Sequence, residues 1–107
     1  MPAAAALTRA RALLAGICRS RTDRFDVEEH LLELELLAET AGAQVVGRVI
    51  QDRGPVHPAT LFRRGKIDEM ALRIGEDGAG LVICDEDLSP AQVRNLESAL
   101  KVRVLDR

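Results

Sequence analysis

The stretch Leu81-Val82-Ile83-Cys84-Asp85-Glu86-Asp87-Leu88-Ser89-Pro90-Ala91-Gln92, residues 81–92, decides the fold class. Its first four residues form a continuous apolar run, which is typical of a strand that is buried on both faces. After the acidic residues, Ser89 fits a helix N-cap, Pro90 fits the first helical position and Gln92 completes a capping box. A buried strand that leads through a short loop into a helix predicts an α/β domain.

The rest of the sequence repeats this alternation of strand and helix patterns. Strands are predicted at residues 11–18, 43–51, 81–84 and 101–106, with helices at 26–41, at 66–74 and after Ser89. This order implies a parallel sheet with right-handed crossovers. The first and third strands are apolar throughout and belong in the centre, whereas the second and fourth carry Arg48, Lys101 and Arg103, as edge strands do. We therefore expect a four-stranded parallel sheet of order 2-1-3-4, with helices on both faces, in a single three-layer domain.

The composition is that of one globular domain. The chain has 107 residues, of which 47% are hydrophobic and 30% charged, with a net charge of −2. No apolar run is long enough to cross a bilayer, so we expect no membrane partner. Residues 1–8 are expected to form a disordered tail before a domain at 9–107. Cys18 and Cys84 are too few for a disulfide scaffold and indicate buried free thiols in a cytoplasmic protein.

The first predicted helix, at 26–41, carries two kinds of pattern. Asp26 and Glu29 have capping-box spacing at its start, and Gly42 fits its C-terminal end. One stripe faces the core and consists of Val27, Leu31, Leu34, Ala38 and Ala41. Leu32 and Leu36 lie away from this stripe, so we expect them to be exposed or to contact a partner. The alternative is a rotated helix in which Leu37, with Leu31 and Leu34, leads the core.

Basic residues gather in the loops that follow the first two predicted strands. In a parallel sheet these loops share the carboxyl end, where α/β proteins place ligands. We call this set the basic rim: Arg19, Arg21, Arg24, Arg53, Arg63, Arg64 and Lys66. A local positive surface on an acidic chain suits docking onto RNA phosphates, although loop arginines can also be merely solvated.

The acidic run Asp85–Asp87 follows the third strand at the same end of the sheet. It could hold Mg²⁺ beside a nucleotide, or it could pair with rim arginines or favour the next helix start. We prefer the structural interpretation. His30 and His57 lie too far from the two cysteines to suggest a metal site, and no triad spacing indicates catalytic residues.

Several motifs between Leu34 and the end of the chain occur in an order typical of one protein family. They are Glu39–Ala43 with Gln51, Pro58–Thr60, Gly65-Lys66 with Ile67–Glu69, Asp87–Gln92, Arg94–Glu97 and Val104–Arg107. On these motifs the chain resembles the N-terminal domain of the HflX family of ribosome-associated GTPases. It departs from the family at Arg63, where a glycine is usual.

The resemblance implies a module that docks on the large ribosomal subunit and its RNA. In the longer proteins it precedes a helical segment and a G domain, for which GTP and Mg²⁺ are implied. This sequence has no Gly-x-x-x-x-Gly-Lys-Ser/Thr loop, so we expect a fragment that has no cofactor or metal and is not itself a GTPase. The alternative function is an ATP-binding domain with weak ATPase activity that uses Gly65, Lys66 and Asp85.

The resemblance also suggests a partner for Leu32 and Leu36. The helical segment or the G domain of the longer protein could cover these two leucines. A weak homodimer of the isolated chain is the other arrangement that would bury them.

Overall fold

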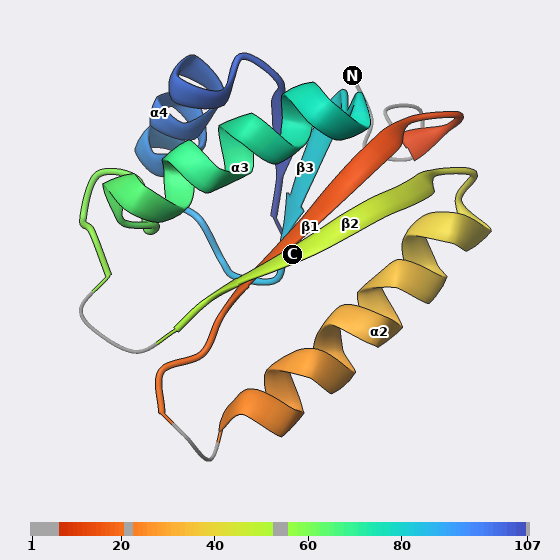
Figure 1. The fold of residues 1–107 in the computed structure, drawn as a ribbon. Coiled ribbons are helices and arrows are strands. Elements are labelled where there is room, and N and C mark those ends of the chain that lie inside the picture. Colours follow the sequence, from red (N-terminus) through yellow and green to blue (C-terminus); the bar gives the residue numbers. More distant parts are fainter. Residues whose placement is uncertain (1–6, 21–22, 53–55, 107) are drawn as a thin grey trace.

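A computed structural model describes residues 7–20, 23–52 and 56–106. The elements follow the predicted order: β1 (Arg11–Ile17), α2 (Arg24–Thr40), β2 (Gln44–Gln51), α3 (Arg64–Asp77), β3 (Leu81–Cys84), α4 (Pro90–Leu100) and β4 (Arg103–Leu105). All strand pairs are parallel, and the strand order is β2-β1-β3-β4 (Figure 1). The predicted α/β class and sheet order are therefore confirmed.

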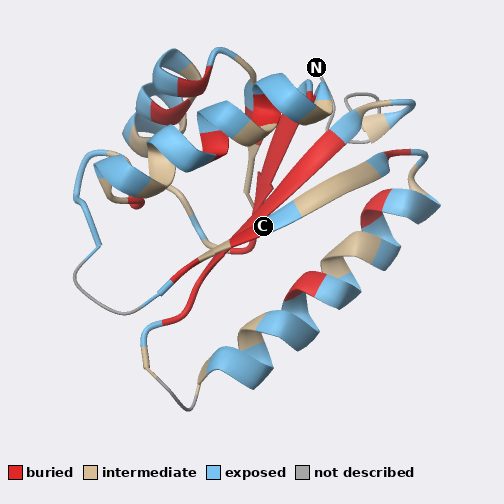
Figure 2. Ribbon diagram, viewed as in Figure 1, coloured by how far each residue is buried: buried red, intermediate tan, exposed pale blue. Residues whose placement is uncertain are grey.

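The sheet separates two hydrophobic clusters, because alternate strand residues point to opposite faces. Leu13, Ala15, Val82 and Cys84 pack with residues of α3 and α4 on one face. Ala12, Leu14, Leu81 and Ile83 pack with residues of α2 on the other. Figure 2 shows the resulting central strip of buried residues along β1 and β3, between the helices of the two faces. The molecule thus has the three layers that the sequence predicts.

The start of α2 differs from the prediction. The helix begins at Arg24 with Asp23 as N-cap and has no side-chain capping bond, so the predicted capping box of Asp26 and Glu29 is wrong. Asp26 instead lies within the first turn, where its negative charge is attracted to the positive end of the helix dipole. Gly42 follows the other end of α2 with a φ of 103°, a conformation that favours glycine.

The other helix ends show how local sequence sets boundaries. α3 begins at Arg64, two residues before the prediction, and ends at Gly78, which has a left-handed φ of 67°. The predicted cap of α4 is confirmed, because the Ser89 side chain accepts from Gln92 N and the Gln92 side chain accepts from Ser89 N. Lys101 takes a left-handed φ of 62° at the end of α4, so β4 begins only at Arg103.

The rotation of α2 about its axis matches the predicted stripe. Leu31 and Ala38 are buried, whereas Leu32 is 51% exposed and Leu36 is 65% exposed. Leu37 is 68% exposed, so the alternative that placed Leu37 in the core is wrong. The helix packs on β1 and β2 through its narrow stripe and leaves three leucines uncovered by the described residues.

The remaining predictions about the chain as a whole can be compared with the described residues. Residues 1–6 of the predicted tail lie outside them, and Leu7 packs against the cluster beneath α2. Cys18 and Cys84 are buried free thiols, as expected. None of the helices in the described part of the chain combines the length and apolar character needed to span a bilayer.

Candidate nucleic-acid interface

The fold brings the loops after β1, β2 and β3 together at the carboxyl end of the sheet. Cys18 N donates to Gln51 O at 2.8 Å, and Asp85 N donates to Ala15 O at 2.8 Å. These bonds extend the strand pairing to the first loop residues. Figure 1 shows β1, β2 and β3 leading into their loops at the same end of the sheet. Basic residues that are far apart in the sequence therefore lie at the same end of the sheet.

Arg19 links the loop after β1 to the loop after β3. Its guanidinium donates two hydrogen bonds to the Glu86 carboxylate, at 2.8 and 3.1 Å. The hydrogen bond with Glu86 raises the pKa of Arg19, and burial opposes that shift. The Arg19 side chain is still half exposed, whereas that of Glu86 is mostly covered. Glu86 therefore holds a cation that can still reach solvent.

Arg24 links the start of α2 to the end of β2. It pairs with Glu28 at 2.8 Å and with Asp52 at 2.8 Å. The hydrogen bond with Glu28 is the main reason that the pKa of Arg24 is raised. Both carboxylates are well exposed, so this network lies on the surface.

The remaining described rim residues surround the first turn of α3. Arg63 N donates to the Gln51 side-chain oxygen at 2.7 Å, and the Arg63 guanidinium donates to Asp52 O at 3.0 Å. Lys66 pairs with Glu69 at 2.8 Å. The Arg64 side chain is exposed and forms no ion pair within the described residues. Arg21 and Arg53 lie outside the described residues.

The departure from the family's glycine pattern causes no backbone strain. Arg63 is the N-cap of α3 with a φ of −72°, which any residue adopts. A Cβ atom at Gly65 would meet nothing within 4 Å, so space does not require a glycine there either. The backbone of this turn is therefore compatible with an arginine at position 63.

The three residues of the alternative nucleotide site do not converge. Lys66 and Gly65 begin α3, which packs on one face of the sheet. Asp85 is buried on the other face, where it lies beside α2 and its carboxylate is 3.8 Å from His30 Nδ1. Among the described residues, no group of three or more His, Cys, Asp or Glu side chains is arranged to hold a metal ion.

Sequence reasoning missed the polar contacts that fix the loops at this end. Gln51 is 1% exposed, and its Oε1 atom anchors the start of α3, while its Nε2 atom has no partner among the described residues. Gln92 and Asn95 of α4 donate to Pro58 O and Ala59 O and hold the loop before α3. Their three-residue spacing places both on one helix face, but nothing in the sequence identifies their carbonyl partners.

Burial also decides the chemistry of Cys84, at the end of β3. Desolvation raises the pKa of its thiol to about 12, and Asp106, Glu86 and Asp85 add to the shift. The nucleophilic thiolate is thus disfavoured at neutral pH. Cys84 is a core residue and not a reactive one.

The sheet and its polar end define the class of protein. A parallel sheet of order 2-1-3-4, with helices on both faces and polar loops at the carboxyl ends of its strands, is a doubly wound α/β domain. The family described as GTP-binding GTPase N-terminal matches residues 28–107. The chain belongs to this family and corresponds to the N-terminal region of HflX proteins.

Relatives that carry the name GTPase HflX come from several bacteria. The protein of Lacrimispora saccharolytica is 47% identical over 97 residues, which are 91% of this chain and 22% of that relative. The protein of Caldanaerobacter subterraneus is 39% identical over the same shares of the two chains. The protein of Escherichia coli is 39% identical over 79 residues, or 74% of this chain and 18% of that relative. The chain thus spans about a fifth of the length of these relatives.

Proposed function

We propose that this chain is a docking module for the RNA of the large ribosomal subunit and that it does not hydrolyse GTP by itself. The observation that carries the proposal is the convergence of basic side chains at one end of the sheet. Arg19, Arg24 and Arg63 come from different segments, yet their guanidinium groups donate to Glu86, to the Asp52 carboxylate and to the Asp52 carbonyl at the same end of the sheet. RNA phosphates are recognised by such locally positive surfaces, even on acidic proteins.

The acidic partners of the rim are compatible with phosphate binding. Exposed ion pairs contribute only about 0–1 kcal/mol each, so a phosphate can replace Glu28 or Asp52 beside Arg24 at low cost. A guanidinium has five N–H donors, and Glu86 occupies two of those on Arg19. The carboxylates therefore orient the cations before docking, which reduces the entropy lost on binding.

The sequence supports the absence of GTP hydrolysis. Gly65-Lys66 is followed by Ile67, so no hydroxyl follows the lysine to bind Mg²⁺. Arg63 and Arg64 precede it, and no phosphate-cradling loop of the required spacing is present. We therefore assign GTP chemistry to the parts of the longer relatives that this chain does not match.

The test is co-sedimentation of the chain with isolated large subunits across a salt series. The variant changes Arg63, Arg64 and Lys66 to Glu, three rim residues in one helical turn. Each cation that no longer binds a phosphate should lower the slope of log affinity against log salt by about 1, and the triple variant should not bind near physiological salt. Undiminished binding of this variant would exclude the basic rim as the docking surface.

A matched control changes the same amount of charge at the other end of the sheet. Arg9, Lys101 and Arg103 are exposed and lie at the amino ends of β1 and β4. Their change to Glu should weaken binding only slightly, through the long-range field. Equal losses of affinity in both triple variants would show that net charge, and not the rim, governs binding. Calorimetry of the same chain with GTP and with ATP checks the nucleotide alternatives.

A further inference from the structure

The two faces of the sheet are not equally covered by helices. A helix is about 10 Å wide and strands lie about 4.8 Å apart, so each face of a four-stranded sheet has room for two helices. On one face α3 packs near β2 and α4 packs near β4. On the other face α2 packs mainly over β1 and β2. Neither α3 nor α4 lies on that face, so the described residues cover the half formed by β3 and β4 only at its edges, through α2 and Leu7.

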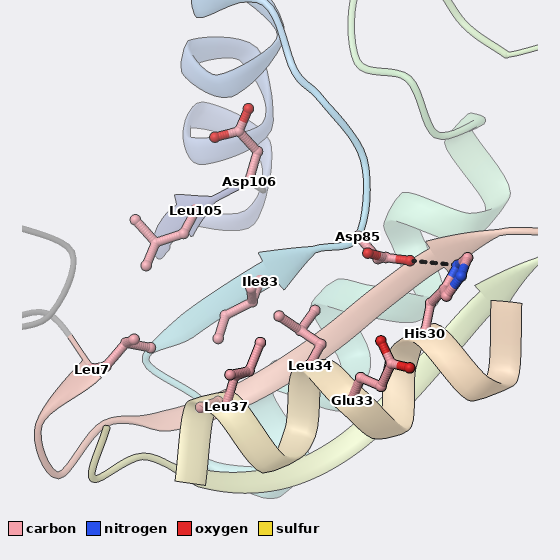
Figure 3. Close-up of a pocket in the computed structure, with 10 residues that line it drawn as sticks. Leu7, His30, Glu33, Leu34, Leu37, Ile83, Asp85, Leu105 and Asp106 are labelled. Carbon is pink, nitrogen blue, oxygen red and sulfur yellow. Dashed lines mark ion pairs between the residues drawn. The ribbon is translucent and has the colours of Figure 1, made fainter. Parts of the chain in front are cut away.

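An open hollow of about 800 Å³ occupies this uncovered half-face. We call it the β3–β4 groove. Its apolar lining comes from α2, from β3 and β4, and from the segment before β1, and consists of Leu7, Leu34, Leu37, Ile83 and Leu105. Figure 3 shows these five side chains converging on one space. The 68% exposure of Leu37 is thus part of a continuous apolar surface.

Acidic side chains line the groove beside this apolar surface. Glu33, Asp85 and Asp106 all contribute to its wall, and His30 is the one basic group among the described residues that line it. His30 faces Asp85 at 3.8 Å, and Asp106 accepts a hydrogen bond from Leu88 N. A lining with three carboxylates and one imidazole favours an occupant that carries lysine or arginine next to its apolar face.

We propose that the β3–β4 groove receives an amphipathic helix supplied by the polypeptide that follows the matched region in the longer HflX relatives. This chain corresponds to the N-terminal region and to only about 22% of those relatives, so they hold much further sequence. Leu105 and Asp106, at the carboxyl end of β4, themselves line the groove. A chain that turns back after β4 therefore enters it directly.

The face of the sheet that α3 and α4 cover gives the reason for this choice of occupant. Leu96 and Leu100 of α4 already fill that face beside β4. A helix that follows β4 can cover apolar area only on the side of α2. There it would lie beside α2 and complete the second pair of helices that a four-stranded sheet accommodates.

The test uses two proteins, the 107-residue chain and the same chain continued with the segment that follows the matched region in the Lacrimispora saccharolytica relative. About 25 residues suffice for a short loop and a helix as long as α2. The same segment is also made as a peptide. In NMR titrations of the chain, the peptide should shift the amides of Leu34, Leu37, Ile83 and Leu105. Shifts confined to Leu32 and Leu36, or none at all, would overturn the proposal.

Two variants of neighbouring leucines provide a matched pair. Leu37 lines the groove and Leu36 does not, although their exposed fractions are 68% and 65%. Leu37→Asp should weaken peptide binding at least tenfold and lower the melting temperature of the extended protein. Leu36→Asp should change neither, and both variants should melt like the parent in the unextended chain. Equal effects of the two variants on peptide binding contradict the groove.

The charge of the groove provides a further test with a different variant. Glu33→Lys should weaken binding of the peptide severalfold, and high salt should reduce the difference from the parent. A sedimentation series on the unextended chain checks for a second copy as the occupant. A dimer that Leu37→Asp abolishes, together with no response to the peptide, would replace our proposal with self-association.

Discussion

The two faces of the sheet differ in how completely helices cover them. On the face of α3 and α4, the large side chains Phe62, Met70 and Leu96 are fully buried. On the face of α2, the helix buries only Leu31 and Ala38, while Leu32, Leu36 and Leu37 remain exposed. Leucine content therefore does not measure a helix's contribution to the core, because the neighbouring layer decides which leucines are shielded from water.

The largest expected effect comes from truncating a buried side chain on the face of the sheet that α3 and α4 cover. Leu96→Ala removes a side chain with no exposure and leaves a cavity, so it should destabilise the chain by about 2–5 kcal/mol. The matched change Leu37→Ala on the face of α2 should lower the free energy of unfolding by less than about 0.5 kcal/mol. Urea denaturation followed by circular dichroism measures both. Similar losses of stability would mean that the two faces are equally packed.

A second difference between the faces appears at alkaline pH. Cys84 packs on the face that α3 and α4 cover. In the folded chain the pKa of its thiol is about 12, above the ordinary thiol value of 9.0. The unfolded thiol ionises first, so the unfolded state is favoured as pH rises from 9 toward 12, by up to about 1.4 kcal/mol per pH unit. Below pH 9 the contribution to stability is fully retained.

Denaturation at several pH values measures this dependence. Cys84→Ala lacks the thiol and should show a shallower loss of stability over the same pH range, whatever its stability at pH 7. An unchanged slope in this variant would assign the alkaline loss to other groups.

Helix capping gives a smaller contrast between α4 and α2. Ser89→Ala removes the side-chain oxygen that accepts from Gln92 N at 3.1 Å and should cost about 1 kcal/mol. Asp23 occupies the N-cap of α2 without any side-chain capping bond, so Asp23→Ala should change stability by less than about half as much. Thermal melts of the two variants rank the caps, and a larger loss of stability for Asp23→Ala would reverse the comparison.

The smallest expected effect belongs to the outer surface of α2. The double variant Leu32→Glu, Leu36→Glu should fold with stability within about 0.5 kcal/mol per site of the parent, because both side chains are already exposed. If the leucines bind a partner or a second copy, the variant should lose that association in sedimentation experiments. An unfolded double variant would show that they belong to the core.

Local sequence was sufficient for the elements and their order. Apolar runs predicted β1 and β3 as central strands because only strands covered on both faces tolerate such runs. Ser89, Pro90 and Gln92 predicted the start of α4 because the capping interaction is complete within four residues. The apolar stripe through Leu31 and Ala38 predicted the face that α2 turns to the sheet.

The contacts among the polar loops at the carboxyl end of the sheet could not be predicted from local sequence patterns. The order of the elements was enough to place Arg19, Arg24 and Arg63 at one end, because loops after parallel strands share an edge. It did not identify Glu86 and Asp52 as ion-pair partners or Gln51 as a buried anchor, since these contacts join residues from different loops. The predicted capping box of Asp26 and Glu29 failed because the helix already begins at Arg24, which places Asp26 inside the first turn.

The sequence by itself determined which segments are strands and helices, how the strands are ordered and which basic residues follow β1 and β2. These properties follow from the periodicity of apolar residues and from the handedness of parallel connections, which act along the chain. Only the tertiary structure decided that α2 covers half of its face, that Asp85 and Lys66 lie on opposite sides of the sheet, and that a groove lies over β3 and β4. Those outcomes depend on how wide a helix is relative to the strands beneath it, which no local pattern records.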